Sequence, residues 1–376
     1  MNQSFRSCGI LLSMLIGAGS GFAALPMTFP GPEWERKAPE DLGVSSKQLA
    51  ESIAFLEQNS GEDGVRELFI VRRGYQIHAG NNVDKVHGVW SCTKSFTSTC
   101  LGLLIDDREC KLDSRAYKWV RTLRKDYRKL ELRHFATMTS GYRALGDAAR
   151  DGYTHGPSKT PFEPAAPLFE PGEKYAYWDS AMNQFANVLT QIAEEPLDDF
   201  FRRRIADPIG MKPKQWRWGD FGEIDGVRVN GGAGNNGNHV YVSARELARF
   251  GHLFLNEGRW KEEQLISRNW VLIATSGRVL ADTPNAWPKS GINGPGVYGF
   301  NWWVNDIDEN GKREWPGAPS TTYAASGYNN NKLFVIPDWD MVIVRLGLDQ
   351  SDTKISRDTW GEFLKRVGES LEGAVR

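Results

Sequence analysis

The 376-residue chain is poor in the residues that mark metal sites and disulfide frameworks, and it carries almost no net charge. It has four cysteines and six histidines, with no Cys-x-x-Cys pair, no His-Glu-x-x-His motif and no tight histidine cluster, so a zinc site is not expected. Forty-six Lys and Arg against 47 Asp and Glu leave a net charge of −1, which gives no general attraction to nucleic acid or anionic lipid. The negative mean hydropathy excludes a multi-span membrane protein.

The first residues of the chain form a separate segment. Arg6 precedes the apolar run 10–16, small residues follow at 17–21, and Phe22-Ala23-Ala24 offers a cleavage site for a signal peptidase. The apolar run is too short to span a bilayer. We therefore expect residues 1–24 to be a signal peptide. The mature chain, 25–376, is then periplasmic or secreted and has no integral membrane segment.

Three cysteines remain after this cleavage: Cys92, Cys100 and Cys110. An odd number in an oxidising compartment leaves at least one free thiol or one intermolecular bridge. All three lie within one short segment, so the sequence predicts no disulfide framework. A bond between Cys100 and Cys110 stays open.

Strand patterns lie at the two ends of the mature chain. In both 67–78 and 332–346 two apolar runs are separated by a turn signal, which is typical of a β-hairpin. The patterns between them are mainly helical. We therefore expect an α/β lobe built from about 25–88 and 295–376, with a helical lobe inserted at about 89–294.

The tetrad Ser91-Cys-Thr-Lys94 is the sharpest chemical signal. Apolar residues continue it at helical spacing, so Ser91 lies near a helix N-terminus and Lys94 lies one turn further on, beside the Ser91 hydroxyl. A serine needs a neighbouring base to become a nucleophile, and a lysine in a pocket can have its pKa lowered enough to help. The same tetrad also arises by chance at ordinary helix starts, so alone it does not establish a catalytic site.

Further segments give the tetrad a context. In order along the chain these are 87–106, 132–141, 171–179, 244–251, 298–303 and 326–337. Together they resemble the serine β-lactamase and penicillin-binding-protein superfamily, and more narrowly its class C-like esterase and amidase branch, similar to 6-aminohexanoate-dimer hydrolase and family VIII carboxylesterases. The resemblance covers nearly the whole mature chain. It implies a β-lactamase-like two-lobed fold, α/β plus all-α, with an antiparallel sheet flanked by the N- and C-terminal helices.

In the second catalytic box of this family a tyrosine lies beside the serine and the lysine. The resemblance places Tyr177 there, as the general base that takes the proton of Ser91 with help from the charge of Lys94. Tyr175 is the competing tyrosine, and the four-residue gap after Gly172 favours Tyr177. A phenol keeps its proton to about pH 10 unless a nearby ammonium stabilises the phenolate. The sequence leaves open whether Lys94 or Tyr177 is neutral before attack.

Asp179 stands where the second box of the family has an asparagine. One interpretation is structural, since an aspartate can cap the helix expected at 180–192. The other is functional: the carboxylate attracts a substrate ammonium group or pairs with Lys94. The sequence leaves both open. Trp178, beside the proposed base, is the best candidate for an aromatic wall of the pocket.

The third box of the family is also altered. Its lysine or histidine is absent from the equivalent stretch 323–328. In β-lactam-directed relatives that cation helps to hold the substrate carboxylate, so its loss argues against efficient β-lactam hydrolysis. By analogy with the branch, we expect Ser326 and Gly327 to contact substrate. The backbone N–H groups of Tyr328 and Ser91 then form the oxyanion hole.

The resemblance implies a serine hydrolase that cleaves an ester or amide through an acyl-enzyme on Ser91. We expect a small-molecule or short peptide-like substrate and no nucleic-acid partner. No metal or organic cofactor is required. One alternative is β-lactamase or DD-peptidase-like activity, and another is a catalytically silent binding or sensor protein on the same scaffold.

Overall fold

The structure, a computed structural model, describes residues 26–147, 161–235, 237–349 and 355–372. The predicted signal peptide, 1–24, lies outside the described residues. Within the described ranges, the structure contains no helix of sufficient length and apolar character to cross a membrane.

A six-stranded antiparallel sheet joins the two ends of the described chain. Its strand order is β10-β11-β12-β13-β1-β2, so an early strand, β1, pairs with a late one, β13. Both predicted hairpins are present, as β1–β2 and β12–β13. The strands are β1 (Glu67–Arg72), β2 (Tyr75–Ala79), β10 (Trp303–Val304), β11 (Tyr323–Gly327), β12 (Asn331–Ile336) and β13 (Met341–Leu346).

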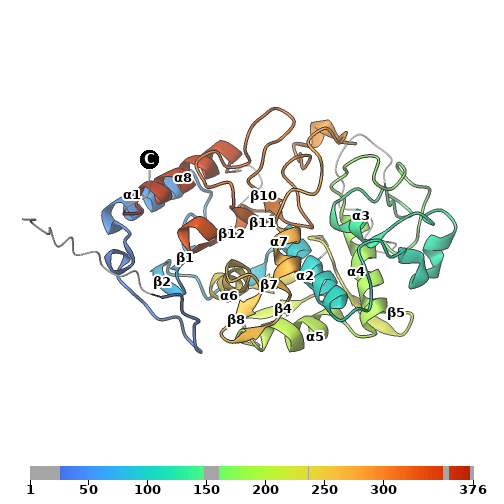
Figure 1. The fold of residues 1–376 in the computed structure, drawn as a ribbon, viewed down its shortest axis with the longest axis horizontal. Helices are drawn as coiled ribbons and strands as arrows, with labels where there is room; N and C mark the ends of the chain where they lie inside the picture. Colours follow the sequence, from blue (N-terminus) through green and yellow to red (C-terminus); the bar gives the residue numbers. More distant parts are fainter. Residues whose placement is uncertain (1–25, 148–160, 236, 350–354, 373–376) are drawn as a thin grey trace, which may run out of the picture.

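Helices cover both faces of this sheet. The helices α1 (Ser46–Gln58) and α8 (Arg357–Glu369) lie side by side on one face (Figure 1), and α6 (Ala244–Leu255) packs against β1, β12 and β13 on the other. Side chains alternate along β1: Leu68 and Ile70 join the core under α1 and α8, while Phe69 and Val71 join the core on the opposite face. All these strand residues are fully buried, which explains why β1 reads as one continuous apolar run.

The part of the chain between β2 and β10 contains most of the α-helices that the structure describes, together with small sheets. The helices are α2 (Thr93–Asp106), α3 (Leu132–Ala136), α4 (Asp179–Ala193), α5 (Leu197–Phe201), α6 and α7 (Arg268–Ala274). The strands are β3 (His87–Gly88), β4 (Trp216–Trp218), β5 (Asp220–Ile224), β6 (Val227–Asn230), β7 (Val240–Val242), β8 (Arg259–Trp260) and β9 (Glu263–Gln264). One hydrophobic core runs from the sheet into this part, and the lobe boundaries stay a prediction.

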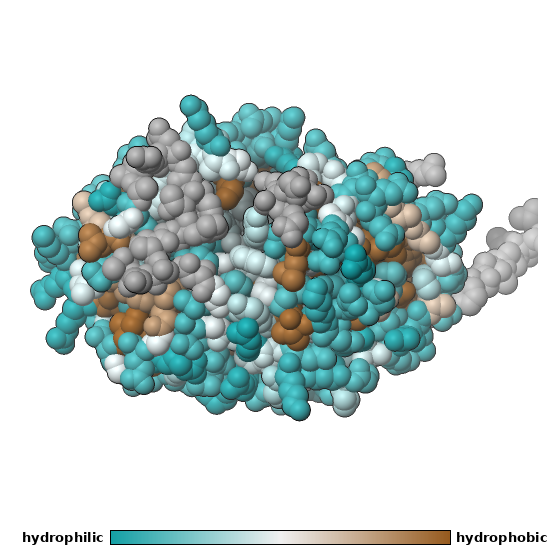
Figure 2. Space-filling model, turned by 180° about the vertical axis from the view of Figure 1, so that it is seen from behind, coloured by the Kyte–Doolittle hydropathy of each residue, from teal (hydrophilic) through white to brown (hydrophobic). Residues whose placement is uncertain are grey.

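Hydrophobic side chains on the surface are scattered. On the face drawn in Figure 2 they form small separate groups among hydrophilic residues. The exposed large hydrophobics include Leu280, Leu145 and Tyr328, which come from distant parts of the sequence. Single exposed apolar residues of this kind are normal and do not mark an interface.

The three cysteines in the described part of the chain are core residues. Cys92, Cys100 and Cys110 are buried free thiols, so the bond that the sequence left open between Cys100 and Cys110 is not formed. Burial raises the pKa of Cys92 and of Cys110 to about 12, so neither forms a thiolate near neutral pH. The thiol beside Ser91 is therefore structural.

Candidate active site

Ser91 lies at the N-terminal end of a central helix. A short 3-10 turn, Trp90–Cys92, runs directly into α2, which is buried from Thr93 to Leu104. Trp90 has a φ of 44°, a left-handed conformation that is uncommon for a residue other than glycine. The turn presents Ser91 to the pocket at a helix start, where backbone N–H groups have no partner within the helix.

Lys94 lies one turn along α2 and points back at Ser91. Its Nζ donates hydrogen bonds to Ser91 Oγ at 2.9 Å and to Asp179 Oδ1 at 2.7 Å. The same atom lies 4.5 Å from the centre of the Tyr177 ring. Lys94 is 1% exposed, and a cation buried to this degree is tolerated only when a carboxylate compensates it. The structure thus brings together the serine and lysine that the sequence paired.

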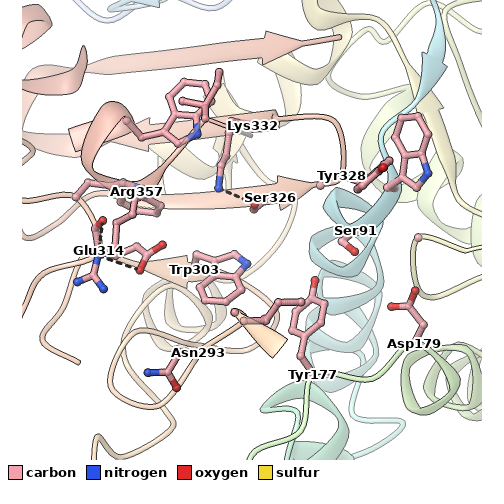
Figure 3. A pocket seen from close by; sticks show the side chains of 18 residues that line it. Ser91, Tyr177, Asp179, Asn293, Trp303, Glu314, Ser326, Tyr328, Lys332 and Arg357 are labelled. Carbon is pink, nitrogen blue, oxygen red and sulfur yellow. Dashed lines mark hydrogen bonds and ion pairs between the residues drawn. The ribbon is translucent and has the colours of Figure 1, made fainter. Parts of the chain in front are cut away.

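Tyr177 comes from the segment before α4, and its phenol points toward Ser91 (Figure 3). The two side chains share a hydrogen bond. Burial, followed by the Asp179 carboxylate, raises the pKa of Tyr177 well above that of an ordinary phenol, and the bond to Ser91 offsets only part of this. Tyr177 therefore holds its proton at neutral pH in the resting site. The competing residue, Tyr175, is fully buried and is not among the described residues that line the pocket.

Asp179 is the first residue of α4 and not its cap. The cap residue is Trp178, whose side chain makes no capping hydrogen bond. The prediction that Asp179 caps the helix is therefore wrong, and its predicted pairing with Lys94 is present, with both side chains 1% exposed. The helix dipole also favours a carboxylate in this first turn. Asp179 therefore places a negative charge next to the Lys94 amine, which is hydrogen-bonded to Ser91.

Trp178 lies behind the pocket wall. It stacks on Trp287 with ring centroids 4.4 Å apart, and its Nε1 donates to Asp147 Oδ2 at 2.9 Å. It is not among the described residues that line the pocket, so the prediction of an aromatic wall at Trp178 is wrong. Sequence analysis did not identify Asp147 as a residue that supports the site. Its other oxygen accepts a hydrogen bond from Ser180 at 2.9 Å, so this buried carboxylate holds the residues on both sides of Asp179.

The strand β11 forms the wall opposite α4. Gly327 packs so closely on the turn before Ser91 that a Cβ there would lie 2.1 Å from the Val89 carbonyl oxygen, so only glycine fits. The ring of Tyr328 meets that of Trp90 edge-on at 5.8 Å. This close approach brings the backbone that follows Gly327 beside the Ser91 turn, as a two-amide oxyanion hole requires. The assignment of the Tyr328 amide stays a prediction.

The pocket itself has a volume of about 350 Å³. Its lining includes the predicted Ser91, Tyr177, Asp179, Ser326, Gly327 and Tyr328, together with Trp90, Gly234, Gly291, Ile292, Asn293, Trp303, Glu314, Trp315, Lys332, Ile355, Arg357 and Trp360. The size suits a small-molecule or short peptide-like ligand. Three tryptophans in this lining are Trp90, Trp303 and Trp315, whereas the neighbouring Trp302 is a core residue.

The pocket contains a cation that sequence reasoning missed. Lys332 lies on β12, directly opposite Ser326 of β11, and donates to its hydroxyl at 2.6 Å.

No group of three or more His, Cys, Asp or Glu side chains that could hold a metal ion occurs in the described ranges. The Lys94 amine and the Tyr177 phenol contact Ser91, and the Asp179 carboxylate binds the amine.

Comparisons with known proteins identify the family and the fold. The family model named Beta-lactamase matches residues 64–357, a range that includes Ser91, Lys94 and Tyr177. A penicillin-binding protein homolog from Caulobacter crescentus superposes with a TM-score of 0.64 at 14% identity, covering 88% of this chain and 99% of that one.

Two further solved structures carry hydrolase names. A family VIII carboxylesterase has a TM-score of 0.61 at 14% identity, covering 86% of this chain and 97% of its own. A Bacillus anthracis protein provisionally named a 6-aminohexanoate-dimer hydrolase has a TM-score of 0.58 at 18% identity, with 92% and 86% covered. At these identities the likeness concerns the fold. The fold and superfamily predicted from the sequence are confirmed, and the chain belongs to the Beta-lactamase family.

Proposed function

We propose that the protein is a serine hydrolase that cleaves an ester or amide through an acyl-enzyme on Ser91, with Lys94 and Tyr177 acting as one base. The observation that carries the proposal is the convergence on Ser91 Oγ of the Lys94 amine at 2.9 Å and the Tyr177 phenol, inside a pocket of about 350 Å³. The hydrolase names of the related structures support the reaction class.

Acylation begins from the form of the site that has lost one proton, shared between Lys94 and Tyr177. Ser91 Oγ attacks the carbonyl carbon and passes its proton to this pair. The amides of Ser91 and Tyr328 hold the oxyanion of the tetrahedral intermediate. The pair then returns the proton to the leaving oxygen or nitrogen as the bond to carbon breaks.

Deacylation repeats these steps with water as the nucleophile. The water gives one proton to the Lys94–Tyr177 pair and attacks the acyl carbon. The same proton returns to Ser91 Oγ as the ester bond breaks, which releases the acid and restores the site. The proton balance needs no group besides Ser91, Lys94, Tyr177 and the attacking water.

A hydrolysis panel tests this proposal. It compares short and long p-nitrophenyl esters, a chromogenic cephalosporin and an amino-terminated amide dimer, on the wild type and on Ser91→Ala. We expect ester or amide turnover that falls by about 10³-fold or more in Ser91→Ala. The matched control is Ser95→Ala, which removes a buried hydroxyl of the same helix that bonds to the Asn301 carbonyl, away from the pocket.

The outcomes separate the alternatives. Turnover of the cephalosporin well above that of the esters would favour a β-lactamase, because the proposed site then accepts a strained amide best. If Ser91→Ala matches the wild type on every substrate, the proposed nucleophile is wrong. A chain without turnover would be a binding or sensor protein on this scaffold. The export predicted from residues 1–24 stays a prediction.

A further inference from the structure

Trp178 lies between Tyr177 and Asp179, the two residues that face the site, and its indole is held by two other segments of the chain. Its Nε1 donates to Asp147 Oδ2 at 2.9 Å, and its ring stacks on Trp287 with the planes 23° from parallel. Neither Asp147 nor Trp287 is among the described residues that line the pocket. The direction and the plane of the indole are therefore fixed by contacts behind the pocket wall.

A local turn fixes the position of the Asp147 carboxylate. In the turn 144–147 the Asp147 N–H donates to the Ala144 carbonyl at 3.1 Å, and the Ala144 N–H donates back to Asp147 Oδ2 at 2.8 Å. Gly146 has a φ of 88°, a conformation that glycine adopts without steric cost. The hydroxyl of Ser180 donates to Asp147 Oδ1 at 2.9 Å. This buried carboxylate thus accepts three hydrogen bonds, two of which come from the start of α4.

The extended backbone transmits this fixed position to Tyr177. Trp178 has a φ of −145° and a ψ of 121°, so successive side chains point to opposite sides, that of Trp178 away from the site and that of Tyr177 into it. The Tyr177 phenol shares a hydrogen bond with Ser91. A catalytic contact of this kind tolerates errors of only about 0.5 Å. Because one peptide unit joins the two residues, a rotation at Trp178 moves the phenol relative to the Ser91 hydroxyl.

We propose that Asp147 is a positioning residue of the active site: by accepting the Trp178 N–H, it holds the Tyr177 phenol against the Ser91 hydroxyl. This inference rests on the proposed function and adds to it a residue that does not line the described pocket. The role requires an acceptor oxygen that faces Trp178, and it does not require a negative charge.

Trp178→Phe tests the inference, because it keeps an aromatic ring against Trp287 and removes the N–H. We expect kcat to fall about tenfold or more, since a misplacement of about 1 Å in a catalytic site can cost about 10²-fold. KM should stay within about twofold, because Trp178 does not line the pocket and binds no substrate.

The readout is the limiting kcat at high pH for a p-nitrophenyl ester, divided by the concentration of active sites that a fluorophosphonate titrates. The titration leaves unfolded protein out of the rate. The high-pH limit is used because a changed contact between Asp179 and Lys94 shifts the protonation of the base and leaves this limit unchanged.

Trp270→Phe is the matched control. Trp270 is also 1% exposed, and it stacks on Phe300 with the planes 13° from parallel. Among the residues that the structure describes, its Nε1 has no hydrogen-bond partner, and Trp270 lies outside the pocket. The same substitution there removes an N–H that holds no other group, so kcat should stay within about twofold of the wild type.

Two substitutions of Asp147 separate the acceptor from the charge. In Asp147→Asn the amide oxygen can replace Oδ2 and accept from Trp178, while the amide nitrogen replaces Oδ1 and donates to the Ser180 hydroxyl. An asparagine has both groups, so kcat should stay within about threefold of the wild type. Asp147→Leu has a similar shape and no acceptor, so kcat should fall as far as in Trp178→Phe.

A double-mutant cycle with Tyr177→Phe shows whether the effect acts through the phenol. In the Tyr177→Phe background, Trp178→Phe should lower kcat/KM by no more than about twofold, because the group that it positions is already gone. Equal losses in both backgrounds would overturn the inference. Wild-type kcat in both Trp178→Phe and Asp147→Leu would overturn it as well.

Failure of this inference differs from failure of the proposed function. If hydrolysis depends on Ser91 but the Asp147 and Trp178 variants do not follow the expected order, Asp147 only stabilises the fold and the hydrolase proposal stands. If no ester is turned over, the rate of fluorophosphonate labelling of Ser91 replaces kcat, with the same order expected. If neither hydrolysis nor labelling depends on Ser91, the hydrolase proposal fails, and the role of Asp147 fails with it.

Discussion

Replacing Lys94 with methionine should lower kcat/KM by about 10³-fold or more and should also destabilise the fold. The activity falls because the amine 2.9 Å from Ser91 Oγ is half of the proposed base. The fold suffers because Asp179, 1% exposed, is left as a buried charge without its cation, a change that typically costs about 3–5 kcal/mol. Ester hydrolysis and urea denaturation measure the two effects separately.

The double variant Lys94→Met/Asp179→Asn is the control for this experiment. It removes both charges of the buried pair, so most of the lost free energy of unfolding should return while activity stays low. Recovery of activity along with stability would mean that Lys94 acts only by holding the fold. In that case Lys94 would not be part of the catalytic base.

Asp179→Asn should increase activity at neutral pH. The Asp179 carboxylate adds to the effect of burial in raising the pKa of Tyr177, so it favours the protonated phenol, which cannot accept the proton of Ser91. We therefore expect activity to rise with pH on an acid limb. Removing the charge should shift this acid limb to lower pH by about one unit or more, which is about tenfold in rate below the limb.

We expect this rise of activity with pH to come from the Lys94–Tyr177 pair and not from neighbouring titratable groups. His239, which stacks on Trp90, has its pKa lowered to about 4 by burial and is neutral across the range of the assay. The pKa values of Cys92, at about 12, and of Tyr298, raised by burial, lie above the range. The profile of kcat/KM between pH 5 and 10 is the measurement. An unmoved limb, or one shifted to higher pH, contradicts this role of Asp179.

The same variant tests the other role considered for Asp179. If the carboxylate recognised a substrate ammonium group, Asp179→Asn would slow cationic substrates and spare neutral ones. Because the structure pairs this carboxylate with Lys94, we expect cationic and neutral substrates to change by the same factor at each pH.

The local part of the site was predictable from the sequence. Ser91 and Lys94 are three residues apart on a helix, and helical geometry alone puts them side by side. Tyr177 joins them from a distant segment, so it could be placed only through the family resemblance. The hairpins β1–β2 and β12–β13 were equally predictable, because their turns and apolar runs are short-range signals.

The errors have physical reasons. Trp178 has extended backbone angles, φ −145° and ψ 121°, so its side chain points opposite to those of Tyr177 and Asp179. Because Tyr177 and Asp179 both face the site, the residue between them, Trp178, must face away from it. For Asp179, a cap residue and the first helical residue differ by one position, which composition does not resolve.

Lys332 was missed although a signal existed. The turn after β11 contains Asn329 and Asn330, both with left-handed φ near 60°, the conformation for which asparagine is favoured in tight hairpins. Centring the hairpin on Asn329 pairs Gly327 with Asn331 and therefore Ser326 with Lys332. A search for the third-box cation along β11 alone could not find a lysine supplied by the neighbouring strand.

The central claim is that the hydroxyl of Ser91 is the nucleophile of the pocket. Fluorophosphonate labelling, read by intact mass and peptide mapping, tests it most directly. The account predicts one adduct, on the peptide that contains Ser91, formed faster as the pH rises and absent from Ser91→Ala. An adduct on another residue, or labelling that persists in Ser91→Ala, would contradict it.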